Sequence, residues 1–326
     1  MTSSDIASPS TFQQSRLGLE GSAAGTRKSA AKKRLRNNAG LGPLLLVVPF
    51  ALLFVLFVVL PIVLSLVQSF KSPLSGRFVG LTNYKYAIGL GDFWRGVERV
   101  IYFGVIQVVI MIVLALILAL VLDSPRCRGR RAFTTIFFLP FAVPSVIAAI
   151  MWGFLLSPQL DHLLHVSAIN PLNPRVVIYS IVVITIWEFV GYNMTLYLAS
   201  LTSVSAELSD AAHIDGATEW DIAFRIKLPL IRRMIALTVI LSILGSLQLF
   251  NEPSILSNLT PIGSSYTPNL LIYNTAFNFN NVPVAAAEST ILAILIISGA
   301  LMFRVIVRQR RGGAGPQTAA LSTGGL

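Results

Sequence analysis

Six long apolar segments dominate the pattern of hydrophobic and polar positions along the chain. Each holds about 20 or more mainly apolar residues, the length that a helix needs to cross a bilayer. Hydrocarbon offers backbone groups no partner outside the helix itself, so helices are the predicted structure. A membrane barrel would need short segments of alternating polarity, and the pattern shows none. The predicted spans are 43–69, 100–122, 133–156, 176–200, 233–256 and 284–307.

Several of these segments contain proline. Pro49 and Pro61 belong to the first span, and Pro140 and Pro144 to the third. Membrane helices tolerate proline because neighbouring groups satisfy the backbone acceptors that it frees. We therefore expect kinked helices within an all-α integral membrane domain of six transmembrane helices over residues 41–311.

Composition agrees with the membrane class. The 326 residues are 54% hydrophobic and 12% charged, whereas a soluble domain carries about 25% charged residues. Residues 1–40 are rich in small and basic residues, so they are expected to form a disordered tail, as are residues 312–326. The first apolar run is too long for a signal peptide and no cleavage site follows it promptly. It is therefore expected to remain as a membrane span.

Basic residues are distributed unevenly between the connections. Nineteen of the 25 Lys and Arg residues lie in the N-terminal tail, in 123–132, in 201–233 and in the C-terminal end from Arg304. Cytoplasmic loops carry the excess of such residues, so both termini are predicted to be cytoplasmic in a multi-pass protein of the cell membrane. The net charge of +11 is then explained by topology, and no nucleic-acid partner is expected.

Two features that often indicate special chemistry are weak here. Cys127 is the single cysteine, so it has no partner for an internal disulfide and is interpreted as an ordinary thiol. His162 and His165 lie three residues apart in a predicted external loop, 157–175. Two histidines without further ligands do not define a metal site, so no metal is expected.

Charged residues are concentrated between the fourth and fifth spans. Eight ionisable side chains occupy the 23 positions from Glu207 to Pro229. The pattern predicts a short helix from Ser205 to Asp215, with Ser205 as its N-cap. Gly216 permits a sharp change of direction, and a second helical piece leads back to the membrane. Two interpretations remain open at this point: a solvated amphipathic loop, or a docking element for a soluble partner.

The motif ELSDAAHIDGA, followed by IKLP at 226–229, resembles the "EAA" loop of permease subunits in binding-protein-dependent ABC importers. Asp210 stands where that family usually has Glu. FVGLTNY at 78–84, FNEPSILSNLTP at 250–261 and YTPNLLIYNTAF at 266–277 resemble segments of the sugar-importer branch, although PIGSS replaces its usual Gly-Gly-Pro. The similarity covers roughly 40–310.

This resemblance implies the type I importer permease fold, in the larger-permease branch of the maltose, glycerol-3-phosphate and multiple-sugar importer family. It also implies partners: a second permease subunit in a heterodimer, two ATP-binding subunits and an extracytoplasmic solute-binding protein. The solute expected from the resemblance is a sugar, an oligosaccharide or a polyol-like compound.

The resemblance further implies that the loop 202–232 couples the membrane domain to the ATPase. The motif residues assigned to that role are Glu207, Asp210, Ala211, Ala212, Asp215, Gly216, Ala217, Leu228 and Pro229. The chain has no G-x-x-x-x-G-K-[ST] phosphate-binding loop. It is therefore expected not to be an enzyme and to bind no cofactor, while the partner ATPase uses ATP and Mg.

Polar residues inside the spans are costly, so they are expected to face a cavity or a partner helix. Thr238, Ser242, Gly245, Gln248 and Glu252 would form one stripe on a continuous helix. Packing between helices is favoured for Ser242 and Gly245, and Glu288 is expected at the membrane interface. The candidates for a solute path are Trp187, Glu188, Tyr192, Asn193, Gln248, Asn251 and Glu252, for which packing is an open alternative.

Other classes of membrane protein were compared with this pattern. A secondary transporter often shows internal repeats, a channel a filter or a sensor ladder, and a membrane enzyme a catalytic motif. None of these signatures is present. A secondary transporter or channel of six spans remains the alternative.

Overall fold

The computed structural model describes residues 41–125, 127–157 and 170–312, with side chains from residue 47 to 301 within those ranges. The predicted tails, 1–40 and 312–326, lie outside the described residues except for Gly312, which ends a helix; the histidine pair lies outside them as well. Within them the structure is helical, and its one β-type contact is an isolated bridge between Lys71 and Phe78. The chain divides into two units, one that ends at Ser65 and one that begins at Leu66.

The first unit holds most of the first predicted span. It contains α2 (Leu41–Phe54), a π-helical turn (Val55–Val59) and the start of α3 (Leu60–Gln68). Pro61 lacks an N–H, and its ring crowds the preceding turn of helix. The wider π turn lies in that preceding turn, so the expected irregularity of this span occurs where the proline requires it.

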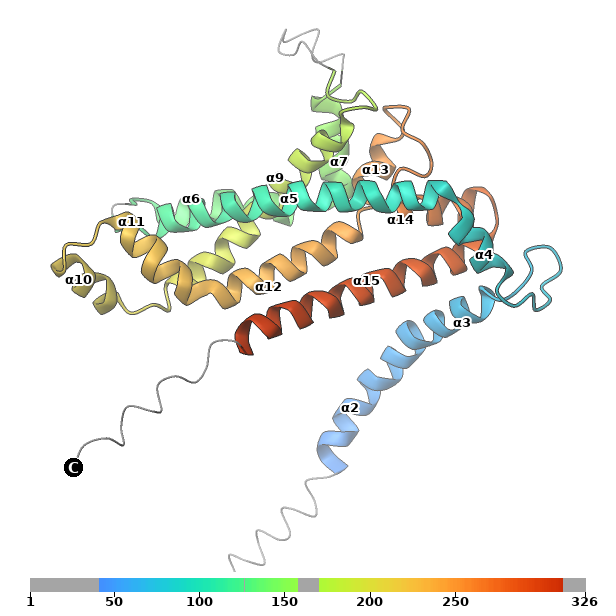
Figure 1. Ribbon diagram of the computed structural model, residues 1–326, viewed down its shortest axis with the longest axis horizontal. Coiled ribbons are helices and arrows are strands. Elements are labelled where there is room, and N and C mark those ends of the chain that lie inside the picture. The colour runs from blue at the N-terminus through green and yellow to red at the C-terminus, as the bar shows by residue number, and fades with distance from the viewer. Residues whose placement is uncertain (1–40, 126, 158–169, 313–326) are drawn as a thin grey trace, which may run out of the picture. The chain divides into compact units, whose positions relative to one another are not determined.

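The second unit contains the other long helices, shown from green to red in Figure 1. Five helical runs of the described chain are long and apolar enough to cross a membrane, and a sixth is counted if one bent pair forms a single span. The five runs are Val47–Gln68, Gly91–Asp123, Val177–Leu201, Glu219–Leu256 and Val282–Leu301.

The third predicted span, 133–156, is not one continuous helix. It consists of α6 (Arg130–Phe138), a 3-10 turn (Leu139–Ala142) and α7 (Ser145–Leu155), with a bend of 96° between the two arms. Val143 is extended, with φ −81° and ψ 126°, because the ring of Pro144 disfavours the helical region for the residue before it. The expected kink is therefore a break of nearly a right angle.

The fifth predicted span, 233–256, is also divided. A helical run begins with α11 (Glu219–Asp221), passes through a π turn (Ile222–Lys227) and continues as α12 (Leu228–Leu247). Pro229 follows the π turn directly, as Pro61 does in the first span, so its ring and its missing N–H fall where the helical run is already irregular. After the break at Gln248–Phe250 follows α13 (Asn251–Leu256).

The core of the second unit forms where α5 (Gly91–Asp123) packs against α9 (Val177–Leu201), with α12 beside both (Figure 1). Ala115 and Ala119 of α5 are fully buried together with Met194 and Tyr197 of α9. Small side chains on one face of α5 let the two backbones approach closely. The Tyr197 hydroxyl also forms a hydrogen bond with Thr238 of α12, which joins the third helix to the pair.

Further helices complete the second unit. The last long helix, α15 (Val282–Gly312), packs against α4 (Thr82–Gly89), and α14 (Pro268–Tyr273) leads through a π turn (Asn274–Asn278) toward it. The short helix α10 (Ala206–Ile214) lies in the connection between α9 and α12.

Candidate functional site

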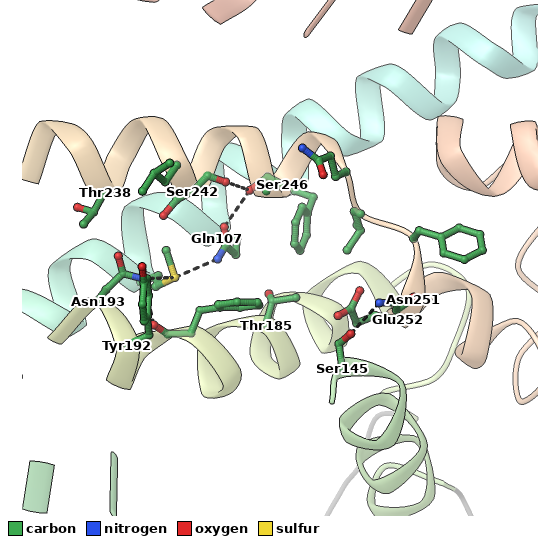
Figure 2. Close-up of a pocket in the computed structure, with 18 residues that line it drawn as sticks. Gln107, Ser145, Thr185, Tyr192, Asn193, Thr238, Ser242, Ser246, Asn251 and Glu252 are labelled. Atoms are coloured by element: carbon green, nitrogen blue, oxygen red, sulfur yellow. Dashed lines mark hydrogen bonds between the residues drawn. The ribbon is translucent and has the colours of Figure 1, made fainter. Parts of the chain in front are cut away.

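A cavity of about 300 Å³ lies among α5, α9, α12 and the residues around the break that follows α12. Figure 2 shows its lining, in which polar side chains from α5, α7, α9, α12 and α13 surround a shared space. The polar lining residues are Gln107, Ser145, Thr185, Tyr192, Asn193, Thr238, Ser242, Ser246, Gln248, Asn251 and Glu252. Four hydrocarbon segments thus bring their polar side chains to one place.

One side of the cavity is formed by α5. Phe103, Gln107 and Met111 follow one another at intervals of four residues, so they lie on the same face of the helix. The Gln107 amide donates to the Met111 sulfur at 3.2 Å, and its carbonyl oxygen accepts from the Ser246 hydroxyl at 3.0 Å. Gln107 is not among the solute-path candidates predicted from the sequence, although a glutamine in an otherwise apolar span could have indicated that it faces a cavity.

A second side is formed by α9. The Tyr192 ring stacks on Phe141 with 4.6 Å between ring centroids, which fixes its orientation. The Asn193 amide donates to the Phe189 carbonyl oxygen at 3.0 Å and to the Met111 sulfur at 3.6 Å. Amide and phenol groups are therefore held in place beside the cavity.

The third side of the cavity is formed by α12 and the residues after it. The prediction that one continuous helix carries the whole polar stripe is wrong. Because α12 ends at Leu247, Thr238 and Glu252 lie on opposite sides of the break. Phe250 departs from helical geometry, with φ −143°. The break nevertheless turns Gln248 and Asn251 toward the cavity, and the Asn251 amide donates to the Ser145 hydroxyl at 2.7 Å.

Five of the seven path candidates line this cavity: Tyr192, Asn193, Gln248, Asn251 and Glu252. The other two are not among its lining residues. Trp187 packs edge-on against Trp152, with 5.8 Å between ring centroids. Glu188 is 4% exposed, and its Oε2 atom has no hydrogen-bond partner among the described residues.

Two further expectations about polar positions need correction. Helix packing was favoured for Gly245, but this residue lines the cavity, and a Cβ atom on it would meet nothing within 4 Å. Ser242 lines the cavity as well. Glu288 was expected at the membrane interface, and it is instead buried in the protein, with 1% of its surface exposed.

The connection between α9 and α12 has the local structure that its residues predict. The Ser205 hydroxyl accepts from the Glu207 N–H at 3.3 Å, as an N-cap does. At the other end of α10, Gly216 is in the left-handed region with φ +83°. Its N–H donates to the His213 carbonyl oxygen, and the Ala217 N–H to that of Ala212. This pair of bonds is a Schellman motif, for which glycine is the preferred residue.

The same connection exposes large apolar side chains. Ile214 is 87% and Trp220 73% exposed, and the Trp220 ring stacks on that of Phe224. Asp210 is exposed on α10 among them. Apolar groups gathered on an exposed and otherwise polar segment indicate a contact surface for another protein.

An ion pair joins this segment to the end of α5. The Lys227 amine lies 2.7 Å from Asp123 Oδ2, and the side chains are only 17% and 11% exposed. Arg130 of α6 lies 3.9 Å from the other oxygen of Asp123. Asp123 thus joins both this segment and α6 to the end of α5, one of the helices that line the cavity.

Comparison with known proteins identifies the class. The family model described as "binding-protein-dependent transport system inner membrane component" matches residues 111–312. The probable ABC transporter permease protein YurN of Bacillus subtilis is 30% identical over 80% of this chain and 94% of its own length. The lactose transport system permease protein LacF of Rhizobium radiobacter is 30% identical, over 79% and 90%.

The solved structures include a bacterial ABC transporter involved in import of the acidic polysaccharide alginate. One of its chains matches with a TM-score of 0.73 at 22% identity, covering 86% of this chain and 99% of that one. The chain belongs to the family of inner membrane components of binding-protein-dependent transport systems. It is a multi-pass membrane permease of the ABC importer type, so the alternative of a secondary transporter or channel is set aside.

Proposed function

We propose that this chain and a second permease subunit together form the path of an ATP-driven importer for a sugar, an oligosaccharide or a polyol-like solute. The observation that carries the proposal is the cavity, where amides, hydroxyls and aromatic rings from separate helices converge. Hydroxyl-rich solutes are bound by such groups, because each hydroxyl both donates and accepts. Relatives named as permeases for lactose, trehalose/maltose and arabinooligosaccharides support the solute class.

The path would be lined by Tyr192, Asn193, Gln248, Asn251 and Glu252. Gln107 and Ser246, which hold each other by a hydrogen bond, belong to the same lining. Trp187 and Glu188 would support this wall from behind without touching the solute. The second permease would complete the path from its opposite side.

Coupling to ATP would use α10 and the turn after it. The helix would dock in a cleft of an ATP-binding subunit, with Asp210 toward a basic group there and Gly216 making the turn. Two such subunits would bind ATP and Mg, and this chain would bind neither. Their closure would move the docked helix and, through the Asp123–Lys227 pair, the end of α5.

The orientation follows from the distribution of basic residues. Both termini and the loop 202–232 would face the cytoplasm, with the six spans in the cell membrane. An extracytoplasmic binding protein would deliver the solute from the other side.

The coupling assignment is tested by purifying the tagged chain in mild detergent and identifying its partners. Gly216→Pro removes an N–H donor and cannot adopt φ +83°. We expect it to lose the ATP-binding subunit and to retain the second permease. Gly76→Pro is the matched control, because Gly76 has φ +64° and also donates its N–H, but lies in the 71–78 turn.

The native chain and the Gly76 variant should both retain all partners. If the Gly216 variant retains the ATP-binding subunit as fully as they do, the turn is not part of the docking site. If no ATP-binding subunit accompanies the native chain, the proposed function itself fails.

A further inference from the structure

The charges around the cavity are of one sign. Among the described residues that line it, Glu252 is the carboxylic acid, and none is a lysine, arginine or histidine. Glu252 is 5% exposed. Glu188 lies behind the wall, close enough to Glu252 for the two carboxyl groups to interact electrostatically. The chain therefore offers the cavity one carboxylic acid, amides and hydroxyls, and no positive charge.

Glu252 lies at one end of the cavity. Figure 2 shows it beside Asn251 and Ser145, with Asn193 and Thr238 at the opposite end. Gln107 and Ser246 lie between these two ends. The acidic group thus has the Asn251 amide beside it at one end of the cavity, and the Asn193 amide lies at the other end, so a solute that fills the cavity would meet both ends.

A carboxylate that leaves water for this cavity would lose its hydration and gain no counter-charge from this chain. A protonated Glu252 would still leave the solute's carboxylate without a counter-charge, because a neutral carboxyl group cannot replace a basic partner. A neutral hydroxyl group would find amide and hydroxyl partners. An ammonium group would also find a carboxylate, with which it forms a charge-assisted hydrogen bond.

We propose that the cavity selects solutes by charge: it accepts neutral or amine-bearing hydroxyl-rich solutes and rejects those that carry carboxylates, with Glu252 as the selecting group. This inference rests on the proposed function, and it narrows the class of solute. It separates this chain from the solved neighbour, which is involved in the import of the acidic polysaccharide alginate.

The test measures the charge preference of the cavity with thiol reagents, without the solute being known. Cys127→Ser removes the single cysteine, and Gly245→Cys then places a thiol in the lining. Gly245 suits this purpose because a Cβ atom there meets nothing within 4 Å. In the purified transport complex, the modification rates by a cationic and an anionic methanethiosulfonate are compared with those of a free thiol in solution.

We expect the ratio of the cationic to the anionic modification rate to be about tenfold or more above the same ratio for a free thiol in solution, as in clefts lined by one sign of charge. Glu252→Gln in the same background should bring the ratio close to the solution value. Glu98→Gln is the matched control, because it makes the same change at an exposed residue outside the cavity lining, and it should leave the ratio unchanged.

A ratio of modification rates equal to that of the free thiol, with Glu252 intact, would overturn the proposal. This result does not depend on whether the Glu252→Gln variant folds. A ratio that survives Glu252→Gln in a folded complex would also overturn it, because Glu252 would not be the selecting group.

Protection of the thiol by solutes provides a second readout. Neutral and amino-sugar oligosaccharides should slow its modification, and uronic-acid oligosaccharides of the same length should not. If the uronic acids protect equally well, the proposed charge selection is wrong. The proposed function is judged separately by the pull-down: capture of the partners supports it even then. Loss of all partners would contradict the proposed function even if the charge ratio were as expected.

Discussion

Removing Lys227 or Asp123 is expected to destabilise the protein, because each side chain would leave the other as a largely buried, unpaired charge. The Lys227 amine and Asp123 Oδ2 are 2.7 Å apart, and the side chains are 17% and 11% exposed. The pair connects residues 104 positions apart in the sequence. Its loss would therefore free the beginning of α12 from the end of α5.

The size of the effect follows from this burial. Breaking a fully buried pair by removing one partner costs about 3–5 kcal/mol, whereas exposed pairs contribute about 0–1 kcal/mol. A pair that remains slightly exposed should lie between these limits, at about 2–3 kcal/mol. Asp123 retains Arg130 at 3.9 Å after Lys227 is removed. Lys227→Met should therefore cost less than Asp123→Leu.

The assay is a double-mutant cycle on the free energy of unfolding in mixed detergent micelles. The two single variants and the double variant should give a coupling energy of about 2 kcal/mol, within the range for residues in contact. Arg225 and Asp221 serve as the matched pair, at 3.2 Å but with side chains 81% and 34% exposed. Their cycle should show no coupling beyond the error of the measurement.

Equal coupling in the two cycles would refute the reasoning, since burial would then not determine the strength of the pair. Coupling near zero for Asp123 and Lys227 would refute the contact itself.

Five further substitutions test the packing of a helix, a turn and a buried hydrogen bond. Gly191→Ala would place a Cβ atom inside the backbone of α6 and should cost about 1–3 kcal/mol by overpacking. Its control is Gly299→Ala in α15, where a Cβ atom meets nothing within 4 Å; this change should stabilise the helix by up to about 1 kcal/mol. Gly216→Ala should cost about 1–2 kcal/mol because of its left-handed backbone. Thr238→Val should cost about 1–3 kcal/mol by leaving the Tyr197 hydroxyl unsatisfied, and more than Tyr197→Phe, after which Thr238 still donates to a backbone carbonyl. The thermal midpoint of the purified protein measures each change.

These comparisons have clear contrary outcomes. If Gly191→Ala were as stable as the α15 control, α6 and α9 would not be in close contact. A Gly216→Ala variant with an unchanged midpoint would argue against the turn geometry, and a Tyr197→Phe variant less stable than Thr238→Val would argue against the second hydrogen bond of Thr238, to the backbone carbonyl.

Sequence alone predicted the features that depend on neighbouring residues. The long apolar runs indicated helices because hydrocarbon leaves the backbone no other partner. Ser205 and Gly216 marked the ends of α10, since a cap and a left-handed turn are set by residues within four positions. The motif from Glu207 to Pro229 indicated the family, to which the comparisons assign the chain. Its docking role stays a prediction.

Only the tertiary structure decided how the polar groups meet. Gln107 bonds Ser246 across 139 positions and Asn251 bonds Ser145 across 106, separations that no local pattern reports. The right-angle bend before α7 and the break after α12 also depend on packing, because proline and polar residues permit a break without setting its size. The cavity forms where these distant breaks coincide, so its lining was inferred only in part from the order of the residues.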